Sequence, residues 1–427
     1  MTQLALATAA PLTLAITLAS AARTRTPQRA AAADARTILI SGGKMTKALQ
    51  LARSFHRAGH DVVLIETARY HRTGHRRSRA VRSFHVVPEP GAPGYVDALA
   101  ELIERERVDV WVPVCSPAAS LHDSVAAESL RDLCEVIHVD VATVTRLDDK
   151  HLFARTAEEL GLGVPETHLV TDPAQVLAFD FARDDRRGRS YVMKSIAYDP
   201  IRRLDLTRLP RDTPTETAEF LATLPISGDN PWILQEFVEG TEYCTHATVR
   251  DGRLQLHCCC ESSAFQINYA AIDDPEIEDW VRRFVGALGL TGQISLDFIR
   301  TPDGELKAIE CNPRTHSAIT LFRDHPDVAS AYLDDGVETV TPLPGARPTH
   351  WIAHELWRAL SRPSTAPERW RVVRSGVDAI WDREDPWPFF AVHHEQIPSL
   401  LLDALRRGRD WVRIDVNIGK LVEPGGD

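Results

Sequence analysis

Residues 292–314 read GQISLDFIRTPDGELKAIECNPR, and this stretch decides the expected fold. Two strand-like runs flank the Asp-Gly pair at 303–304, which is typical of a two-residue β-hairpin turn. With that turn, Asp297 lies directly opposite Glu310, and Asn312 points to the same face as Glu310. Two carboxylates placed so close together need a cation or a shared proton.

The side chains on this face offer only oxygen ligands, from two carboxylates and one amide. Such a set suits magnesium rather than zinc, and magnesium is commonly shared between one or two carboxylates and substrate phosphates. A solvated hairpin would alternate with polar partners, whereas here the acidic residues lie among Ile294, Leu296 and Phe298. The hairpin is therefore predicted to hold magnesium and a nucleotide. A turn of another length would shift the register and separate the carboxylates.

The composition limits the class of protein. The 427 residues are 44% hydrophobic and 26% charged, enough for two or three domains with their own cores. A net charge of −11 argues against a general nucleic-acid-binding protein, which would carry a basic face. The seven cysteines are odd in number and include no Cys-x-x-Cys pair, so neither a disulfide framework nor a zinc ribbon is expected.

Two clusters look like metal sites but lack the required geometry. Cys258, Cys259 and Cys260 are adjacent, and on a strand their side chains alternate between faces, so they cannot converge on one ion. The run 393–395, His-His-Glu, lacks the spacing of zinc ligands. Both are predicted to be packing residues.

The first 22 residues carry no charge and are rich in leucine, alanine and threonine, and Arg23, Arg25 and Arg29 follow. A secretory signal has its positive charge before the apolar run, not after it. The positive-inside rule places the arginine side, and so the body of the protein, in the cytoplasm. Three interpretations remain open: a marginal membrane anchor, a disordered leader, or a start codon assigned too far upstream. We favour weak membrane attachment and treat residues 1–35 as leader and linker.

Residues 36–140 predict a Rossmann-like domain with a doubly wound parallel sheet. A strand at 37–40 leads through Ser41-Gly42-Gly43 into a helix and then a second strand at 61–65. The amides of this turn could hold an anionic substrate group, or the turn could simply be the tight connection that such a unit needs. Cys115 follows a strand end; a packed thiol is favoured over a nucleophile because no helper residue is adjacent.

Residues 141–345 predict a second domain that carries cationic and acidic candidates for nucleotide binding. Lys150 begins a helix, and Lys194 ends an apolar strand, where a charge is costly unless it is paired. Arg202 and Arg203 follow in a loop and could reach the same phosphates. A hairpin with an Asp-Gly turn at 251–252 is also expected.

The strand beginning at Trp232 breaks near Val238, which leaves backbone groups for an adenine edge. Glu236 could accept from the exocyclic amine, and Glu242 could take ribose hydroxyls. From residue 346 to 427 the chain is rich in tryptophan and is predicted to form a C-terminal subdomain that packs back on the nucleotide-binding domain.

The order and spacing of these residues resemble the ATP-grasp superfamily over residues 36–340. The resemblance implies an α/β ATP-grasp fold with an N-terminal doubly wound parallel (pre-ATP-grasp) domain. It also implies ATP and Mg²⁺, which Mn²⁺ could replace, as cofactors. The implied roles are phosphate binding for Lys150, Lys194 and Arg202, adenine and ribose binding for Glu236, Val238 and Glu242, metal binding for Asp297, Glu310 and Asn312, and catalysis for Arg314 and Lys194. One departure is the run 195–200, SIAYDP, which stands where many members have a Gly-rich loop.

A closer resemblance is to the ATP-grasp ligases of mycosporine biosynthesis. It is carried by residues 42–60, 113–117, 258–269, 310–319 and 414–427. Members join glycine to the cyclohexenone 4-deoxygadusol through a phosphorylated enol, giving mycosporine-glycine, ADP and phosphate. The polar run 261–269 is either a substrate loop or an ordinary connection. The alternatives are a ligase that joins an ordinary carboxylate to an amine, and an ATP-binding module without turnover.

Overall fold

The computed structural model describes residues 2–23, 34–186, 188–197, 202, 205–262 and 268–424. The chain divides into two compact units. The first contains the described residues of Met1–Val144, Cys244–Ser295 and Pro313–Pro424, and the second contains those of Thr145–Tyr243 and Leu296–Asn312.

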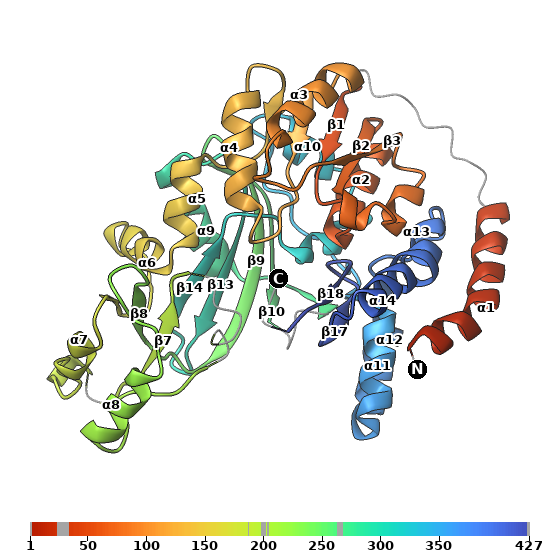
Figure 1. Cartoon of the computed structure of the whole chain (residues 1–427). Helices are drawn as coiled ribbons and strands as arrows, with labels where there is room; N and C mark the ends of the chain where they lie inside the picture. Colours follow the sequence, from red (N-terminus) through yellow and green to blue (C-terminus); the bar gives the residue numbers. More distant parts are fainter. Residues whose placement is uncertain are drawn as a thin grey trace. The chain divides into compact units, whose positions relative to one another are not determined.

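A five-stranded parallel sheet organises the N-terminal part of the first unit, with the order β3-β2-β1-β4-β5. Its strands β1, β2 and β3 are labelled in Figure 1. This order is that of a doubly wound sheet. The predicted parallel domain is therefore confirmed. Its elements are β1 (Thr37–Ile40), α2 (Thr46–Arg57), β2 (Asp61–Thr67), η1 (Ala68–Tyr70), η2 (Gly74–Arg77), β3 (Ser83–Val87), α3 (Tyr95–Glu106), β4 (Val110–Val112), α4 (Ser120–Leu130) and β5 (Glu135–Val136).

Side chains that alternate along β1 pack into two different cores. Ile38 and Ile40 belong to a core with Leu49 and Phe55 of α2. Leu39 belongs to a second core that includes residues of α3 and α4. Helices thus cover both faces, and the carboxyl ends of the strands are left for the loops that follow them.

A second five-stranded sheet has the order β12-β10-β9-β13-β14. The predicted hairpin at Asp251 and Gly252 is present, and both residues have positive φ, 47° and 72°, as a two-residue type I′ turn requires. The elements of this region are β9 (Thr241–Arg250), β10 (Arg253–Glu261), β11 (Asn268–Tyr269), β12 (Ala271–Ile272), α9 (Pro275–Leu288), β13 (Gly292–Arg300) and β14 (Leu306–Asn312).

The turn between β13 and β14 differs from the two-residue turn predicted. Thr301 N donates to Glu305 O at 2.9 Å and Gly304 N donates to Thr301 O at 2.9 Å, so residues 302–304 form a three-residue loop. Pro302 favours the first central position of a type I turn, and Gly304, at φ 93°, supplies the left-handed residue that completes it. The predicted loop length is therefore wrong, and next to the turn Thr301 pairs with Glu305.

The second unit contains a three-stranded antiparallel sheet, β6-β8-β7, in which β8 pairs with both neighbours. Its elements are α6 (Lys150–Glu159), β6 (Thr167–Val170), α7 (Pro173–Leu177), η3 (Asp184–Arg186), β7 (Tyr191–Ser195), α8 (Pro214–Ala222) and β8 (Trp232–Glu236). The helix α5 (Val141–Asp148) spans the division between the units.

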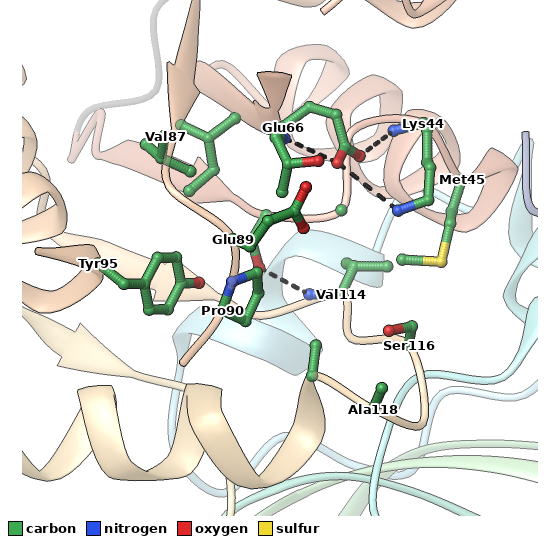
Figure 2. Close-up of a pocket in the computed structure, with 15 residues that line it drawn as sticks. Lys44, Met45, Glu66, Val87, Glu89, Pro90, Tyr95, Val114, Ser116 and Ala118 are labelled. Atoms are coloured by element: carbon green, nitrogen blue, oxygen red, sulfur yellow. Dashed lines mark hydrogen bonds and ion pairs between the residues drawn. The ribbon is translucent and has the colours of Figure 1, made fainter. Parts of the chain in front are cut away.

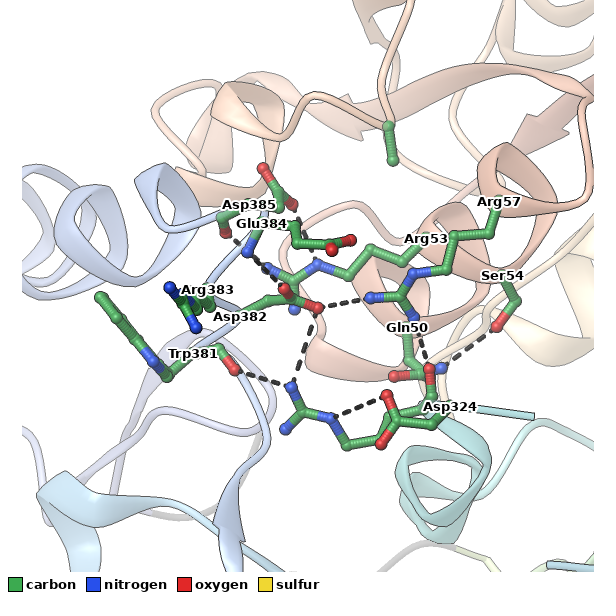
Figure 3. Close-up of polar contacts among 12 residues, drawn as sticks. Gln50, Arg53, Ser54, Arg57, Asp324, Trp381, Asp382, Arg383, Glu384 and Asp385 are labelled. Atoms are coloured by element: carbon green, nitrogen blue, oxygen red, sulfur yellow. Dashed lines mark hydrogen bonds and ion pairs between the residues drawn. The ribbon is translucent and has the colours of Figure 1, made fainter. Parts of the chain in front are cut away.

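The C-terminal residues of the first unit pack against α2 through buried charges (Figure 3). Arg53 Nε donates to Asp385 Oδ2 at 2.9 Å, and Ser78 Oγ donates to the same oxygen at 2.6 Å. Arg53 and Asp385 are nearly fully buried, so neither charge can be satisfied by water. The remaining elements are η5 (Ser317–Phe322), α10 (Val328–Leu333), β15 (Thr349–His350), α11 (Ile352–Ser361), η6 (Pro363–Thr365), α12 (Ala366–Ser375), β16 (Val377–Asp378), α13 (Trp387–Ala391), η7 (Val392–Gln396), α14 (Ile397–Arg406), β17 (Arg413–Asp415) and β18 (Lys420–Val422).

The N-terminal segment forms helix α1 (Thr2–Arg23), which is long and apolar enough to cross a membrane by length and composition. One side of it bonds to C-terminal residues of the same unit: Gln3 Nε2 donates to Pro398 O of α14 at 3.0 Å, and Ser20 Oγ donates to Arg383 O, in the bend before α13, at 2.8 Å. Leu4 and Leu12 on its other side are about two-thirds exposed.

Candidate active site

Lys150 and Lys194 of the second unit lie close enough to influence each other's charge. Lys150 begins a helix, and Lys194 lies near the end of a strand. Lys150 is the first residue of α6, and Asp149 caps this helix by accepting from His151 N and Leu152 N. Lys194 lies in β7, and its Nζ donates to Gln235 Oε1 of β8 at 2.8 Å. Both ammonium groups are therefore fixed by regular elements rather than by loops.

The surroundings of Lys194 combine burial with several charges. Burial lowers the pKa of Lys194, and Lys150 lowers it further, while Glu310, Glu242 and Asp297 raise it. Two cations and three carboxylates thus act on one another within the second unit. A polyanion that brings its own negative charge would relieve the repulsion between the two lysines.

Two of the predicted metal ligands, Asp297 and Asn312, lie within contact distance, and the third, Glu310, lies beside Lys150. Asn312 Nδ2 lies 3.5 Å from Asp297 Oδ2, and Lys150 Nζ lies 3.7 Å from Glu310 Oε1. All three are half-buried oxygen-bearing side chains on paired strands. This donor set, two carboxylates and an amide beside two lysines, fits Mg²⁺ held jointly with phosphate oxygens. Among the described residues, no group of three or more His, Cys, Asp or Glu is placed to hold a metal ion.

The predicted adenine segment follows β8. Val238 is buried, and Glu242 is exposed at the start of β9. The carboxylate of Glu236 is already engaged, because Lys307 Nζ lies 3.1 Å from its Oε2 and Glu166 N donates to that same oxygen at 3.1 Å. An adenine ring at this segment would therefore meet backbone groups rather than this carboxylate.

Arg314 lies in the first unit, on the loop that follows β14. Lys47 of α2 holds this loop, with Nζ donating to Thr315 O at 2.6 Å and to Cys115 O at 3.3 Å. Burial, reinforced by the nearby Arg314, lowers the pKa of Lys47 to about 7. Sequence reasoning missed Lys47, because a lysine on a helix is usually a surface residue.

Arg202 is described only by its local backbone, where Arg202 O accepts from Asp205 N at 2.9 Å. Arg203, residues 198–200 of the unusual phosphate-loop run, and residues 263–267 of the predicted substrate loop lie outside the described residues.

Cys115 and the run Cys258–Cys260 are buried in the structure. Cys115 is buried and its thiol donates to Asp123 Oδ2 at 2.9 Å. Burial raises the pKa of Cys115 well above its usual range, which keeps it a protonated, packed thiol. Cys258, Cys259 and Cys260 are buried strand residues.

A second polar site lies in the first unit, at the carboxyl ends of the parallel strands (Figure 2). It is a cavity of about 150 Å³ whose lining includes Lys44, Glu66, Thr67, Glu89 and Ser116. The sequence analysis did not single out Glu66 or Thr67. The sequence does contain an indication of these two residues, because they are polar and end a buried strand. Ligands of open sheets bind at the edge where such strands end.

Neither a protein-family model nor a curated protein sequence matches this chain. Among solved structures, N5-carboxyaminoimidazole ribonucleotide synthetase in its ADP complex matches with a TM-score of 0.55 and 14% identity, covering 79% of this chain and 88% of that chain. N5-carboxyaminoimidazole synthetase from Staphylococcus aureus with ADP matches with a TM-score of 0.54 and 14% identity, covering 75% and 82%. A biotin carboxylase β,γ-ATP complex from Campylobacter jejuni matches with a TM-score of 0.51 and 12% identity, covering 70% and 71%.

At such low identity these likenesses establish the fold. The chain has the ATP-grasp fold with an N-terminal parallel-sheet domain, as the sequence predicted. Because one fold supports many activities, the function of this chain has to be inferred from the residues of its site.

Proposed function

We propose that the protein is an ATP-dependent carbon–nitrogen ligase that joins the amino group of glycine to the cyclohexenone 4-deoxygadusol. The products would be mycosporine-glycine, ADP and phosphate. The superfamily part of this proposal is supported by the fold, and the particular substrates are supported by the sequence resemblance alone.

One observation carries the proposal: in the second unit, Lys150 and Lys194 lie within the electrostatic reach of Asp297 and Glu310. Lysines and carboxylates arranged in this way match what a magnesium nucleotide needs, with ammonium groups for phosphates and oxygen ligands for the metal. The solved structures of similar fold include complexes with ADP and with an ATP analogue.

The protein's own contribution would be to position groups and to neutralise charge. Lys150 and Lys194 would hold the nucleotide phosphates, while Asp297, Glu310 and Asn312 would hold Mg²⁺. A bound magnesium ion would reduce the negative charge that opposes attack on the phosphate. The sequence motif assigns Arg314 to the charge that develops on the phosphoryl group during transfer.

The proposed reaction has two steps, each of which forms one bond and breaks another. The enol oxygen of the ring takes the γ-phosphoryl group, and the bond to ADP breaks. The glycine amine then attacks the ring carbon, phosphate leaves with the electron pair of the C–O bond, and the nitrogen loses a proton. No protein nucleophile is needed, which agrees with the protonated state of Cys115.

The test is ADP release on incubation with ATP, Mg²⁺, 4-deoxygadusol and glycine, together with the absorbance change of the ring. ADP release and product absorbance would support the proposal. ADP release with an ordinary carboxylate but not with the enolone would favour a generic carboxylate–amine ligase. No ADP with any acceptor would leave an ATP-binding module without turnover.

We further propose that the protein is cytoplasmic and that α1 gives it weak attachment to a membrane surface. The supporting feature is the exposed apolar side of the helix, which carries Leu4, Leu12, Ile16 and Leu18. Flotation with neutral phospholipid vesicles should recover the wild type, and Leu12→Asp should remain at the bottom of the gradient. Equal recovery of both proteins would contradict attachment through α1.

A further inference from the structure

The turn between β1 and α2 appears in the sequence as a ready anion site, but the amides of Gly43, Lys44 and Thr46 already donate within the protein. Gly43 N donates to Ile65 O at 3.0 Å, and Lys44 N donates to Glu66 Oε2 at 2.8 Å. Thr46 N donates to Asn417 O at 2.9 Å. A phosphate at this helix start would have to displace internal acceptors, one of which is itself a carboxylate.

The positive charge of the turn is also neutralised within the fold. Glu66 is 3% exposed, and its Oε1 accepts from Thr67 N at 2.8 Å and lies 3.6 Å from Lys44 Nζ. The same ammonium group lies 4.4 Å from the centre of the Tyr70 ring. Lys44 is therefore paired, and the cavity lining also includes an exposed carboxylate, Glu89, whose side chain points into the space in Figure 2.

The cavity nevertheless has groups that suit hydroxyls. Thr67 is 7% exposed, and its Oγ1 has no hydrogen-bond partner among the described residues. A buried hydroxyl without a partner is unfavourable unless a ligand or water supplies one. Ser41 Oγ accepts from Val114 N at 3.3 Å, which leaves its O–H group as a donor, and Ser116 also lines the space.

The size and walls of the cavity suit part of a small ring. Its volume of about 150 Å³ corresponds to about five water molecules at the roughly 30 Å³ that each takes in the liquid. Met45, Ile65 and Val87 give it apolar walls. Its polar lining includes hydroxyl groups, the carboxylates of Glu66 and Glu89, and the ammonium group of Lys44, which is paired with Glu66. Such a lining accepts alcohol groups on a carbon ring.

We propose that this cavity binds the hydroxyl-bearing edge of a small carbocyclic acceptor that carries no phosphate, and that it rejects phosphorylated analogues. The alcohol groups would donate to Glu89 and Thr67 and accept from Ser41. A phosphate group in the cavity would lie near the carboxylates of Glu66 and Glu89. The amides of Gly43, Lys44 and Thr46 already donate within the protein, so they could not offset the repulsion between these negative charges. This repulsion would disfavour a phosphorylated ligand. The identity of the ring as 4-deoxygadusol rests on the proposed function, whereas the preference for an unphosphorylated polyol rests on the cavity.

Binding without ATP or glycine tests the cavity separately from turnover. Equilibrium dialysis with 4-deoxygadusol, followed by its absorbance, gives a dissociation constant for the wild type, Thr67→Val and Glu89→Gln. The matched control is Glu104→Gln, at an exposed position of α3 outside the cavity. Each cavity variant should raise the dissociation constant by about tenfold, as loss of one hydrogen bond of about 1.4 kcal/mol would do. The control should not change it.

A second pair of probes does not depend on the identity of the acceptor. In saturation-transfer NMR, myo-inositol should receive signal from the wild-type protein and clearly less from Thr67→Val at the same ligand concentration, while myo-inositol 1-phosphate should receive none. The cavity proposal is overturned if the phosphate binds as well as the neutral polyol, or if both cavity variants bind the polyol like the wild type. Absence of ADP release alongside polyol binding would instead count against the proposed function alone.

Discussion

Two lysine–glutamate pairs with almost equal separations do different things in this molecule. Lys44 Nζ lies 3.6 Å from Glu66 Oε1 in the first unit, and Lys150 Nζ lies 3.7 Å from Glu310 Oε1 in the second. The Glu66 side chain is 2% exposed, whereas that of Glu310 is 38% exposed. Glu66 also accepts two backbone N–H groups. The first pair therefore stabilises the fold, whereas the second is exposed enough for a ligand to reach it.

The difference teaches that a distance between charges does not identify a functional pair. In the first unit, carboxylates satisfy amides and buried cations, so removing them should cost stability. In the second, the side chains of Lys150, Asp297 and Glu310 stay partly exposed to water and ligand, so removing their charges should cost activity. The predictions below test this division.

The largest effect is expected from Asp297→Asn in the second unit. Loss of one carboxylate from the proposed metal site should lower kcat about 10³-fold, comparable to removal of a group that stabilises the transition state. The melting temperature should stay near that of the wild type, because Asp297 is only half-buried. Steady-state ADP release and a thermal melt check both. Glu158→Gln, on the exposed side of α6, is the control, and an unfolded Asp297→Asn protein would show that the hairpin charge is structural.

The next effect concerns stability in the first unit. Asp385→Ala leaves Arg53 buried without its carboxylate and should lower the free energy of unfolding by about 3 kcal/mol. Urea denaturation measures the change. Asp403→Ala removes an exposed pair with Arg407 and should cost less than about 1 kcal/mol. Equal losses in the two variants would contradict the distinction between buried and exposed pairs.

A smaller effect is expected for Lys194 of β7, which we propose binds the nucleotide phosphates. Lys194→Met should raise the KM for ATP by about 10- to 100-fold, the loss of one hydrogen bond to a charged group. The KM for glycine should change little. Initial rates at varied ATP measure this, with Arg155→Met on exposed α6 as the control. An unchanged KM for ATP would remove Lys194 from the nucleotide site.

The smallest expected effect is a change in how the stability of the protein depends on pH. Burial lowers the pKa of His257 to about 4 from 6.5, so the folded state keeps it neutral while the unfolded chain binds a proton. Stability is therefore complete above pH 6.5 and is lost as the pH falls toward 4, by about 1.4 kcal/mol per pH unit for one such group. His257→Leu should make the fall in melting temperature shallower. His71→Leu, at an exposed position, should keep the wild-type slope.

The class of fold and most residues of the proposed nucleotide site could be predicted from the residue pattern alone. Alternating and continuous apolar runs specify strands and helices locally, and the spacing of Asp297, Glu310 and Asn312 follows from the two-residue period of a strand. The residue pattern misjudged one turn, because Pro302 changes which turn the following Asp-Gly pair can form.

Which charged groups remain available to a ligand depends on how the folded chain packs around them. Glu66 and Lys47 satisfy groups far away in the chain, so no local pattern could reveal that the turn amides are occupied or that a helix lysine is buried. Burial and hydrogen-bond satisfaction depend on every segment packed around a group, and those segments are brought together only by folding.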